Sequence, residues 1–105
     1  MGYGFGGGFG GGNMQALMRQ AQKMQEDMKR IREEIDSTEY TSSVGGGMVE
    51  VTMYGNKTVK AVKIKPEVVD PDDVEMLEDL IASAVGDALN KIAEDEKAKL
   101  PNLGM

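Results

Sequence analysis

The side chains able to do chemistry in this sequence are carboxylates, amines, guanidinium groups and hydroxyls, and the chain has no histidine and no cysteine. Histidine is the commonest general base and a common metal ligand, and cysteine supplies thiolate nucleophiles and metal ligands. Their absence weighs against hydrolases, transferases and zinc proteins. We therefore expect a protein that is not an enzyme and that carries no cofactor and no metal.

Three other patterns have a simpler explanation than the site they suggest. Gly6, Gly8 and Gly11 match the G-x-G-x-x-G nucleotide loop, but no strand precedes them and dense glycine produces the pattern by chance. The acidic run over residues 70–79 lacks the spacing and the glycine of a calcium-binding EF-hand, so helix capping explains it better. The nine methionines are better explained as adaptable apolar side chains than as soft-metal ligands.

Basic residues gather near the start of the chain, although the formal net charge is -6. Residues 13–32 hold two acids and five cations, and these are Arg19, Lys23, Lys29, Arg30 and Arg32. Such a face can contact nucleic-acid phosphates without reading the base sequence. It can equally be a solvated helix face with internal pairs, such as Glu26 with Arg30 and Lys23 with Asp27. Lysines of the following segment, Lys57, Lys60, Lys63 and Lys65, either extend the basic patch or protect strands from aggregation.

The five cations of residues 13–32 fall in a segment that is predicted to form one long helix. Asn13 is a suitable N-cap, and apolar residues recur in alternating steps of three and four up to Ile35, so the helix is predicted to end at Asp36 or Ser37. This is a coiled-coil pattern, and a helix of about 35 Å should outreach the sheet. We expect its stripe to form a dimer interface made by Met14, Leu17, Ala21, Met24, Met28 and Ile31.

Three strands and a second helix follow in the pattern. Alternating side chains predict strands over residues 38–44, 48–54 and 58–65, with turns at Gly45-Gly46-Gly47 and Gly55-Asn56 and a β-bulge near Ala61-Val62. Asp70 and Pro71 are the predicted N-cap and first residue of the last helix, which Pro101 stops. Small residues in that helix, from Ala82 to Ala88, predict close packing. The order α-β-β-β-α gives an α+β fold with a three-stranded antiparallel sheet.

The domain organisation follows from these elements. We expect a disordered glycine-rich tail over residues 1–12, a single folded domain over residues 13–100, and a short C-terminal tail over residues 101–105. No apolar run is long enough for a membrane span, and the N-terminus lacks the features of a signal peptide. The expected location is the cytoplasm, without a membrane partner.

Several segments, in the same order along the chain, resemble a known family. These are Leu17-Met18-Arg19-Gln20-Ala21-Gln22-Lys23-Met24-Gln25 with Glu33-Glu34-Ile35, Val49-Glu50-Val51-Thr52 with Gly55, Val62-Lys63-Ile64-Lys65-Pro66, Glu75-Met76-Leu77-Glu78-Asp79-Leu80, and Asp87-Ala88 with Lys91. Over residues 14–99 the chain resembles the YbaB/EbfC family of bacterial nucleoid-associated proteins. No single motif is unique to that family, so the specificity comes from their order.

The resemblance implies a tweezer-like homodimer with protruding N-terminal helices, bound to double-stranded DNA in the nucleoid. The implied role is chromosome organisation, gene regulation or DNA repair. It favours phosphate contact over a merely solvated face for Arg19, Lys23, Lys29, Arg30 and Arg32. The alternative is a protein-interaction dimer that serves replication or recombination proteins without binding DNA itself. Neither hypothesis involves a small-molecule substrate.

Overall fold

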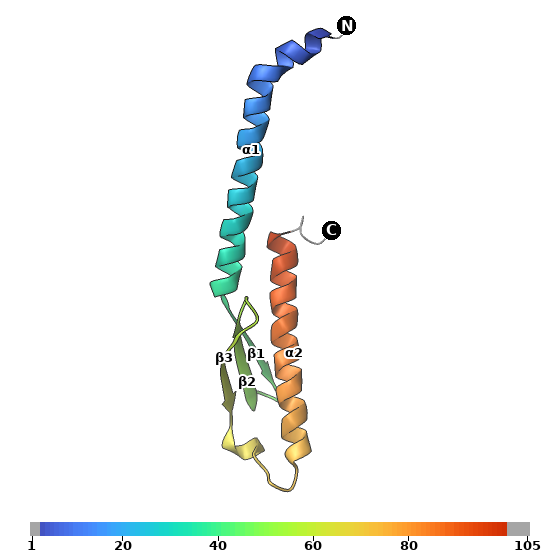
Figure 1. Cartoon of the computed structure of the whole chain (residues 1–105). Coiled ribbons are helices and arrows are strands. Elements are labelled where there is room, and N and C mark those ends of the chain that lie inside the picture. The colour runs from blue at the N-terminus through green and yellow to red at the C-terminus, as the bar shows by residue number, and fades with distance from the viewer. Residues whose placement is uncertain (1–2, 101–105) are drawn as a thin grey trace. The chain divides into compact units, whose positions relative to one another are not determined.

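The computed structural model describes residues 3–100, with side chains from Asn13 onward. The elements are α1 (Tyr3–Ser37), β1 (Glu39–Val44), β2 (Val49–Tyr54), β3 (Val59–Ile64), the 3-10 turn η1 (Pro66–Val68) and α2 (Val74–Lys99). The strands form one antiparallel sheet in the order β1-β2-β3, and α2 runs along it (Figure 1). The predicted α-β-β-β-α order and the α+β fold are confirmed.

Contacts between Cα atoms divide the chain into two compact units, one ending at Ile31 and one beginning at Arg32. The boundary therefore falls inside α1, and the single folded domain expected over residues 13–100 stays a prediction. Residues 13–26 are all exposed, so this stretch contributes nothing to the buried core. The second unit holds the end of α1, the sheet and α2.

The start of α1 differs from the prediction. The helical backbone begins at Tyr3, so Asn13 lies inside the helix and does not cap it. Glycine can adopt helical backbone angles, although inside a helix it is less favourable than alanine by about 0.5–1 kcal/mol per residue, which is why the sequence did not predict a helix here. The disordered tail that we expect over residues 1–12 stays a prediction about the chain in solution. The predicted stop at Pro101 and the tail over residues 101–105 lie outside the described residues.

The core lies between α2 and one face of the sheet. Val49, Val51 and Met53 of β2 are buried there, and each alternates with a half-buried residue of the opposite face. Three more core residues, Ala84, Ala88 and Ile92, recur every fourth position along α2. Small side chains let the helix approach the strands closely, as the sequence predicted. In β1, the buried Ser42 hydroxyl donates a hydrogen bond to the backbone oxygen of Ala84.

Two hairpin turns depend on glycine for different reasons. Gly45, Gly46 and Gly47 adopt φ angles of 62°, 66° and 90°, which side chains other than glycine rarely allow. Gly55 follows β2 and lies against the end of α1, where a Cβ atom would be 1.9 Å from the backbone oxygen of Ile35. The Gly55 amide also donates to the carbonyl of Thr38. The second hairpin therefore packs directly against the C-terminal end of α1.

The predicted β-bulge is present but is displaced toward the start of β3. Thr52 pairs with Ala61, and Met53 pairs with Val59, so Lys60 is the extra residue between them. The sequence placed the bulge near Ala61-Val62, where the apolar phase changes. Ala61 proves to lie on the polar face opposite α2, so the change of phase comes from the unpaired Lys60.

The N-terminus of α2 corrects a second prediction. Asp73 is the N-cap, and its side chain accepts a hydrogen bond from the backbone amide of Met76 at 3.3 Å. Asp70 accepts a hydrogen bond from the amide of Asp72, and its carbonyl accepts one from the amide of Asp73. Asp70 and Pro71 therefore form a turn just before the helix. Aspartate is favoured both at helix N-caps and in turns, so residue type alone could not show which of the two aspartates is the cap.

Candidate nucleic-acid interface

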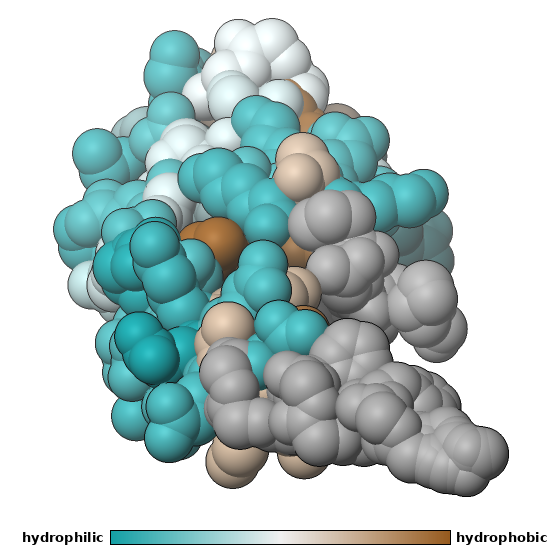
Figure 2. All heavy atoms as spheres, turned by 90° about the horizontal axis from the view of Figure 1, so that it is seen from above, coloured by the Kyte–Doolittle hydropathy of each residue, from teal (hydrophilic) through white to brown (hydrophobic). Residues whose placement is uncertain are grey.

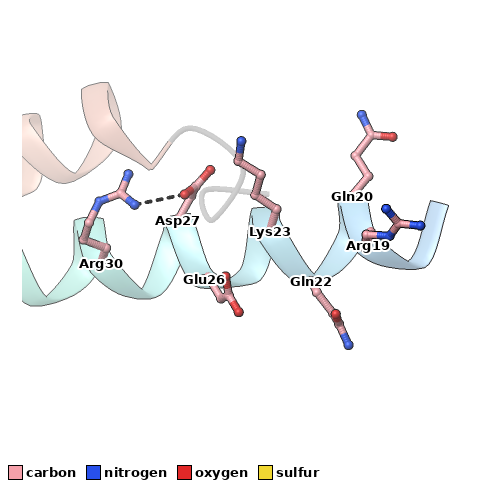
Figure 3. A pocket seen from close by; sticks show the side chains of 7 residues that line it. All are labelled: Arg19, Gln20, Gln22, Lys23, Glu26, Asp27 and Arg30. Carbon is pink, nitrogen blue, oxygen red and sulfur yellow. Dashed lines mark hydrogen bonds and ion pairs between the residues drawn. The ribbon is translucent and has the colours of Figure 1, made fainter. Parts of the chain in front are cut away.

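The first unit presents a polar face built by helical spacing. Gln20, Lys23, Asp27 and Arg30 recur every three or four residues, so they lie on one side of α1, and Figure 3 shows them pointing the same way. Together with Arg19, Gln22 and Glu26 they line an open depression of about 560 Å³. Glu26 and Gln22 point to the other side of the helix in this view (Figure 3).

The cations of this face differ in whether they have an acidic partner. Arg30 binds Asp27 at 3.0 Å, with both side chains largely exposed at 60% and 41%. An exposed pair of this kind contributes little to stability and can be exchanged for a ligand phosphate at little cost. Within the part of the chain that the structure describes, Arg19, Lys23 and Lys29 have no ion-pair partner. The predicted pairing of Lys23 with Asp27 does not form.

Arg32 lies in the second unit and is engaged differently. Its guanidinium binds Glu96 of α2 at 2.8 Å and Asp36 at 2.9 Å. The hydrogen bond to Glu96, against some desolvation, raises the pKa of Arg32, and the bond to Asp36 adds to this effect. Sequence reasoning grouped Arg32 with the phosphate-contacting cations, and that role stays a prediction. Its ion pairs give it a structural role that local spacing could not reveal.

A network of acids and bases surrounds Arg32 at the end of α2. Lys57, in the turn between β2 and β3, also binds Glu96 at 3.2 Å. Burial alone would raise the pKa of Glu96, but the hydrogen bonds from Arg32 and Lys57 outweigh it and leave that pKa lowered. The neighbouring Asp95 accepts a 2.5 Å hydrogen bond from the Tyr40 hydroxyl of β1 and binds Lys99 at 3.2 Å. The network joins the end of α1, the sheet and α2.

The apolar stripe predicted as a dimer interface is largely uncovered in the single chain. Met14, Leu17 and Met24 are 56%, 60% and 53% exposed. Ala21 is also exposed, and Met28 and Ile31 are half-buried. A contiguous row of exposed apolar side chains is typical of a surface that contacts another molecule. The structure holds one chain, so their role in a dimer stays a prediction.

The four lysines around β3 fall into two groups. Lys57 binds Glu96, and Lys60 binds Glu39 of β1 at 2.7 Å. Lys63 and Lys65, at the other end of the strand, have no ion-pair partner among residues 13–100. They line a small hollow of about 280 Å³ beside Gly47. Only this second pair has its charge available for another molecule.

The described residues offer little support for other classes of site. They contain no group of three or more histidine, cysteine, aspartate or glutamate side chains placed to hold a metal ion. Over the same residues, the structure has no helix with the length and apolar character of a membrane span. The surface visible in Figure 2 is mostly hydrophilic, with apolar residues between hydrophilic ones.

Comparison with known proteins decides the family. The model of the YbaB/EbfC DNA-binding family matches residues 10–104. The chain belongs to this family. A nucleoid-associated protein from Clostridium botulinum is 56% identical over 100 residues, which cover 95% of this chain and 88% of the relative. Another, from Ruminiclostridium cellulolyticum, is 52% identical over 100 residues, with coverage of 92% and 87%.

A solved structure of another protein shares the fold of this YbaB/EbfC member. An uncharacterized protein from Helicobacter pylori superposes with a TM-score of 0.69 at 25% sequence identity. The match covers 85% of this chain and 94% of the other. Membership of a DNA-binding family directs attention to the cations of α1 that have no acidic partner.

Proposed function

We propose that this protein is a nucleoid-associated protein that binds double-stranded DNA as a homodimer in the bacterial cytoplasm. Its role would be in chromosome organisation, gene regulation or DNA repair. The observation that carries the proposal is a set of exposed cations on α1, Arg19, Lys23 and Lys29, which have no ion-pair partner among the described residues. Family membership supports DNA as their ligand.

The chemistry of this contact is phosphate neutralisation. Arg19, Lys23, Lys29 and Arg30 lie off the row of apolar residues along α1, so a second copy on that row would leave them accessible. Lysine and arginine that displace counterions from phosphate bind without strong sequence preference. So few cations per chain should give affinities near the roughly 10⁻⁴–10⁻⁶ M of non-specific binding at physiological salt.

The homodimer forms through the apolar row of α1 in this proposal. Met14, Leu17 and Met24 are exposed in the single chain, and a second α1 would remove them from water. Ala21, Met28 and Ile31 complete the row. A two-fold axis would then present two basic faces to one duplex.

A salt titration of DNA binding tests the proposal. The variant Arg19→Gln/Lys23→Gln/Lys29→Gln should bind every duplex more weakly than the parent. It should lower the slope of log affinity against log salt by up to about 0.9 per lost phosphate contact. Fluorescence anisotropy with a labelled duplex of random sequence measures both quantities.

The matched control removes three other cations without ion-pair partners among the described residues. Lys63→Gln/Lys65→Gln/Lys97→Gln changes the net charge by the same amount. It should keep most of the parental slope if α1 is the interface. Equal losses in both variants would mean that total charge, and not the α1 face, sets the affinity. A parent that binds no DNA at low salt would contradict the proposal.

A second candidate function rests on the acidic segment that leads into α2 and continues along the first part of that helix. Residues 66–90 contain eight acids and no cation, which would repel DNA phosphates but attract a basic protein. In this alternative the dimer serves a replication or recombination protein without touching DNA. Failure of the parent to bind DNA at low salt would favour it.

A further inference from the structure

The face of the sheet that points away from α2 carries polar side chains, and their pairing differs along the strands. The residues of β2 that alternate with the buried core residues point to this face. Near the end of β2, the hydroxyls of Thr41 and Thr52 share a hydrogen bond at 3.0 Å, and Glu39 binds Lys60 at 2.7 Å. In this half of the face the polar groups therefore satisfy one another.

The other half of the same face lacks such pairing. Ser43, Glu50 and Lys63 lie in one row across the three strands, because Glu50 is the register partner of both other residues. Opposite charges that face each other across two strands commonly interact. Glu50 and Lys63 nevertheless form no ion pair, and the side chains of Ser43 and Lys65 also have no hydrogen bond or ion pair among residues 13–100. These four polar side chains can therefore bind another molecule without first losing a partner.

The unpaired side chains border a hollow of about 280 Å³. Its lining residues are Gly47, Glu50, Lys63, Ile64, Lys65 and Pro66. A Cβ atom on Gly47 would lie 4.0 Å from both the Lys65 ammonium and the Ser43 hydroxyl, so these two donors converge over a residue that has no side chain. Ligand pockets commonly measure roughly 300–1,000 Å³, so a hollow of this size suits a small ligand.

The donors of the hollow suit a phosphate monoester. Such a group carries about −1.5 to −2 charges near neutral pH, and it has three strong acceptor oxygens. Lys63 and Lys65 supply two positive charges at the hollow, which match this charge. The Ser43 hydroxyl adds a third donor beside the Lys65 ammonium.

Glu50 distinguishes a small ester from a nucleic-acid strand. Its carboxylate lines the same hollow, where it repels negative charge and accepts hydrogen bonds. A DNA strand that places one phosphate on the lysines brings further phosphates of the same strand toward this carboxylate. A small ester that also carries a hydroxyl group offers the carboxylate a hydrogen-bond donor instead.

We propose that this hollow binds a small phosphate monoester that carries a hydroxyl group, as a ligand and not as a substrate. The phosphate contacts Lys63, Lys65 and Ser43, and the hydroxyl group of the ligand donates a hydrogen bond to Glu50. The site lies on the sheet and uses none of the cations of α1. It therefore goes beyond the proposed DNA contact and does not depend on it.

Amide NMR of the full chain, titrated with glycerol phosphate, tests the hollow. The amide signals of Ser43, Gly47, Glu50, Lys63 and Lys65 should shift and saturate. The dissociation constant should be about 1–10 mM, because the contacts are few and exposed. Inorganic phosphate has no carbon-bound hydroxyl group to offer Glu50 and should bind several-fold more weakly. The inference is overturned by equal affinity for the two probes, or by no saturable shift in the hollow up to roughly 50 mM glycerol phosphate.

Two single-charge variants test whether the lysines of the hollow hold the phosphate. Lys65→Gln should weaken glycerol phosphate binding by about threefold or more, because one of the two positive charges is lost. Lys97→Gln is the matched control, because it removes a lysine of α2 that has no ion-pair partner among the described residues and lies outside the hollow. The control should bind like the parent. Equal losses in both variants would show an effect of total charge and would overturn the site.

Glu50→Ala tests the selectivity. This variant should bind inorganic phosphate more tightly than the parent, because a repelling charge is gone, and it should lose the preference for glycerol phosphate. Circular dichroism checks that each variant is folded. A preference that persists without the carboxylate would contradict its contact with the hydroxyl group of the ligand.

A DNA duplex distinguishes the two sources of phosphate. Under the proposed function, the duplex should shift amide signals of α1 and leave those of the hollow unchanged. Shifts in the hollow at a lower phosphate concentration with the duplex than with glycerol phosphate would make the hollow a DNA contact and would overturn the inference. A parent that binds glycerol phosphate but no DNA fails the proposed function and leaves this site intact.

Discussion

Glu96 is the residue on which the end of α1, the second hairpin and α2 converge. It binds Arg32 at 2.8 Å and Lys57 at 3.2 Å, and it is itself 23% exposed. Next to it, burial and the hydrogen bond to Asp95 raise the pKa of Tyr40 to about 12, so Tyr40 stays a hydrogen-bond donor at neutral pH. The carboxylates of Asp95 and Glu96 are both ionised at neutral pH, and both bind side chains of other elements.

Acid should destabilise the fold through these two carboxylates. The hydrogen bond from Tyr40, against some burial, lowers the pKa of Asp95 below its ordinary 3.8, and the pKa of Glu96 is lowered below 4.5. A lowered folded-state pKa contributes stability above the unfolded value and loses it as pH falls through the folded value. Urea unfolding should therefore report constant stability down to about pH 5 and a decline below about 4.5.

The variant Glu96→Gln isolates one part of this acid response. It should lower the free energy of unfolding at pH 7 by about 0.5–1 kcal/mol, the scale of a partly exposed ion pair. Its decline in acid should also be shallower than that of the parent. Glu94→Gln is the control, because Glu94 is exposed and has no ion pair among the described residues. Identical acid curves for parent and Glu96→Gln would contradict the assignment.

The sequence predicted which charged residues of α1 are exposed, but it did not predict all of their ion-pair partners. It identified Arg19, Lys23 and Lys29 as exposed cations, because they fall outside a regular apolar row. It could not find the partner of Arg32, because Glu96 lies far along the chain and only the packing of α2 on the sheet brings them together. Helical spacing reveals partners within a turn of the same helix and no others.

The N-terminus of α2 offers a prediction at the scale of an element. Asp73→Ala removes the side chain that caps the helix and should cost about 1 kcal/mol of folding free energy. Asp70→Ala removes only the bond to the amide of Asp72 and should cost less. Urea or thermal unfolding compares them. A larger loss of folding free energy for Asp70→Ala than for Asp73→Ala would instead indicate that Asp70 is the N-cap, as the sequence predicted.

Elements with a strong apolar periodicity could be predicted closely. The start of α1, the N-cap of α2 and the position of the bulge could not. The alternation in β2 gave its extent to within one residue, because one face is buried and the other is half-exposed. The bulge at Lys60 was displaced by one residue, because apolar Ala61 lies on the polar face. Val62 of β3 is 44% exposed although it is apolar. This was not predictable either, since the pattern does not say how many strands α2 covers.

The oligomeric state is the prediction that belongs to the whole molecule. Light scattering should give twice the protomer mass of 11.3 kDa. Met24→Asp puts a charge in the apolar row of α1 and should weaken the dimer. Met18→Asp is the control on the same helix, because Met18 is 61% exposed and lies beside the row. An unchanged dimer in Met24→Asp, or an equal loss in Met18→Asp, would contradict the apolar row of α1 as the interface.

Gly55 has a consequence for how the sequence can change over time. Although Gly55 belongs to a hairpin, a Cβ atom there would lie 1.9 Å from a backbone oxygen of Ile35, and backbone cannot rotate away as a side chain can. Even alanine, the smallest replacement, would separate the hairpin from the end of α1. The next hairpin residue, Asn56, is exposed and its side chain faces no such backbone contact. In a saturation library, position 55 is therefore expected to retain a single amino acid, while position 56 accepts more replacements.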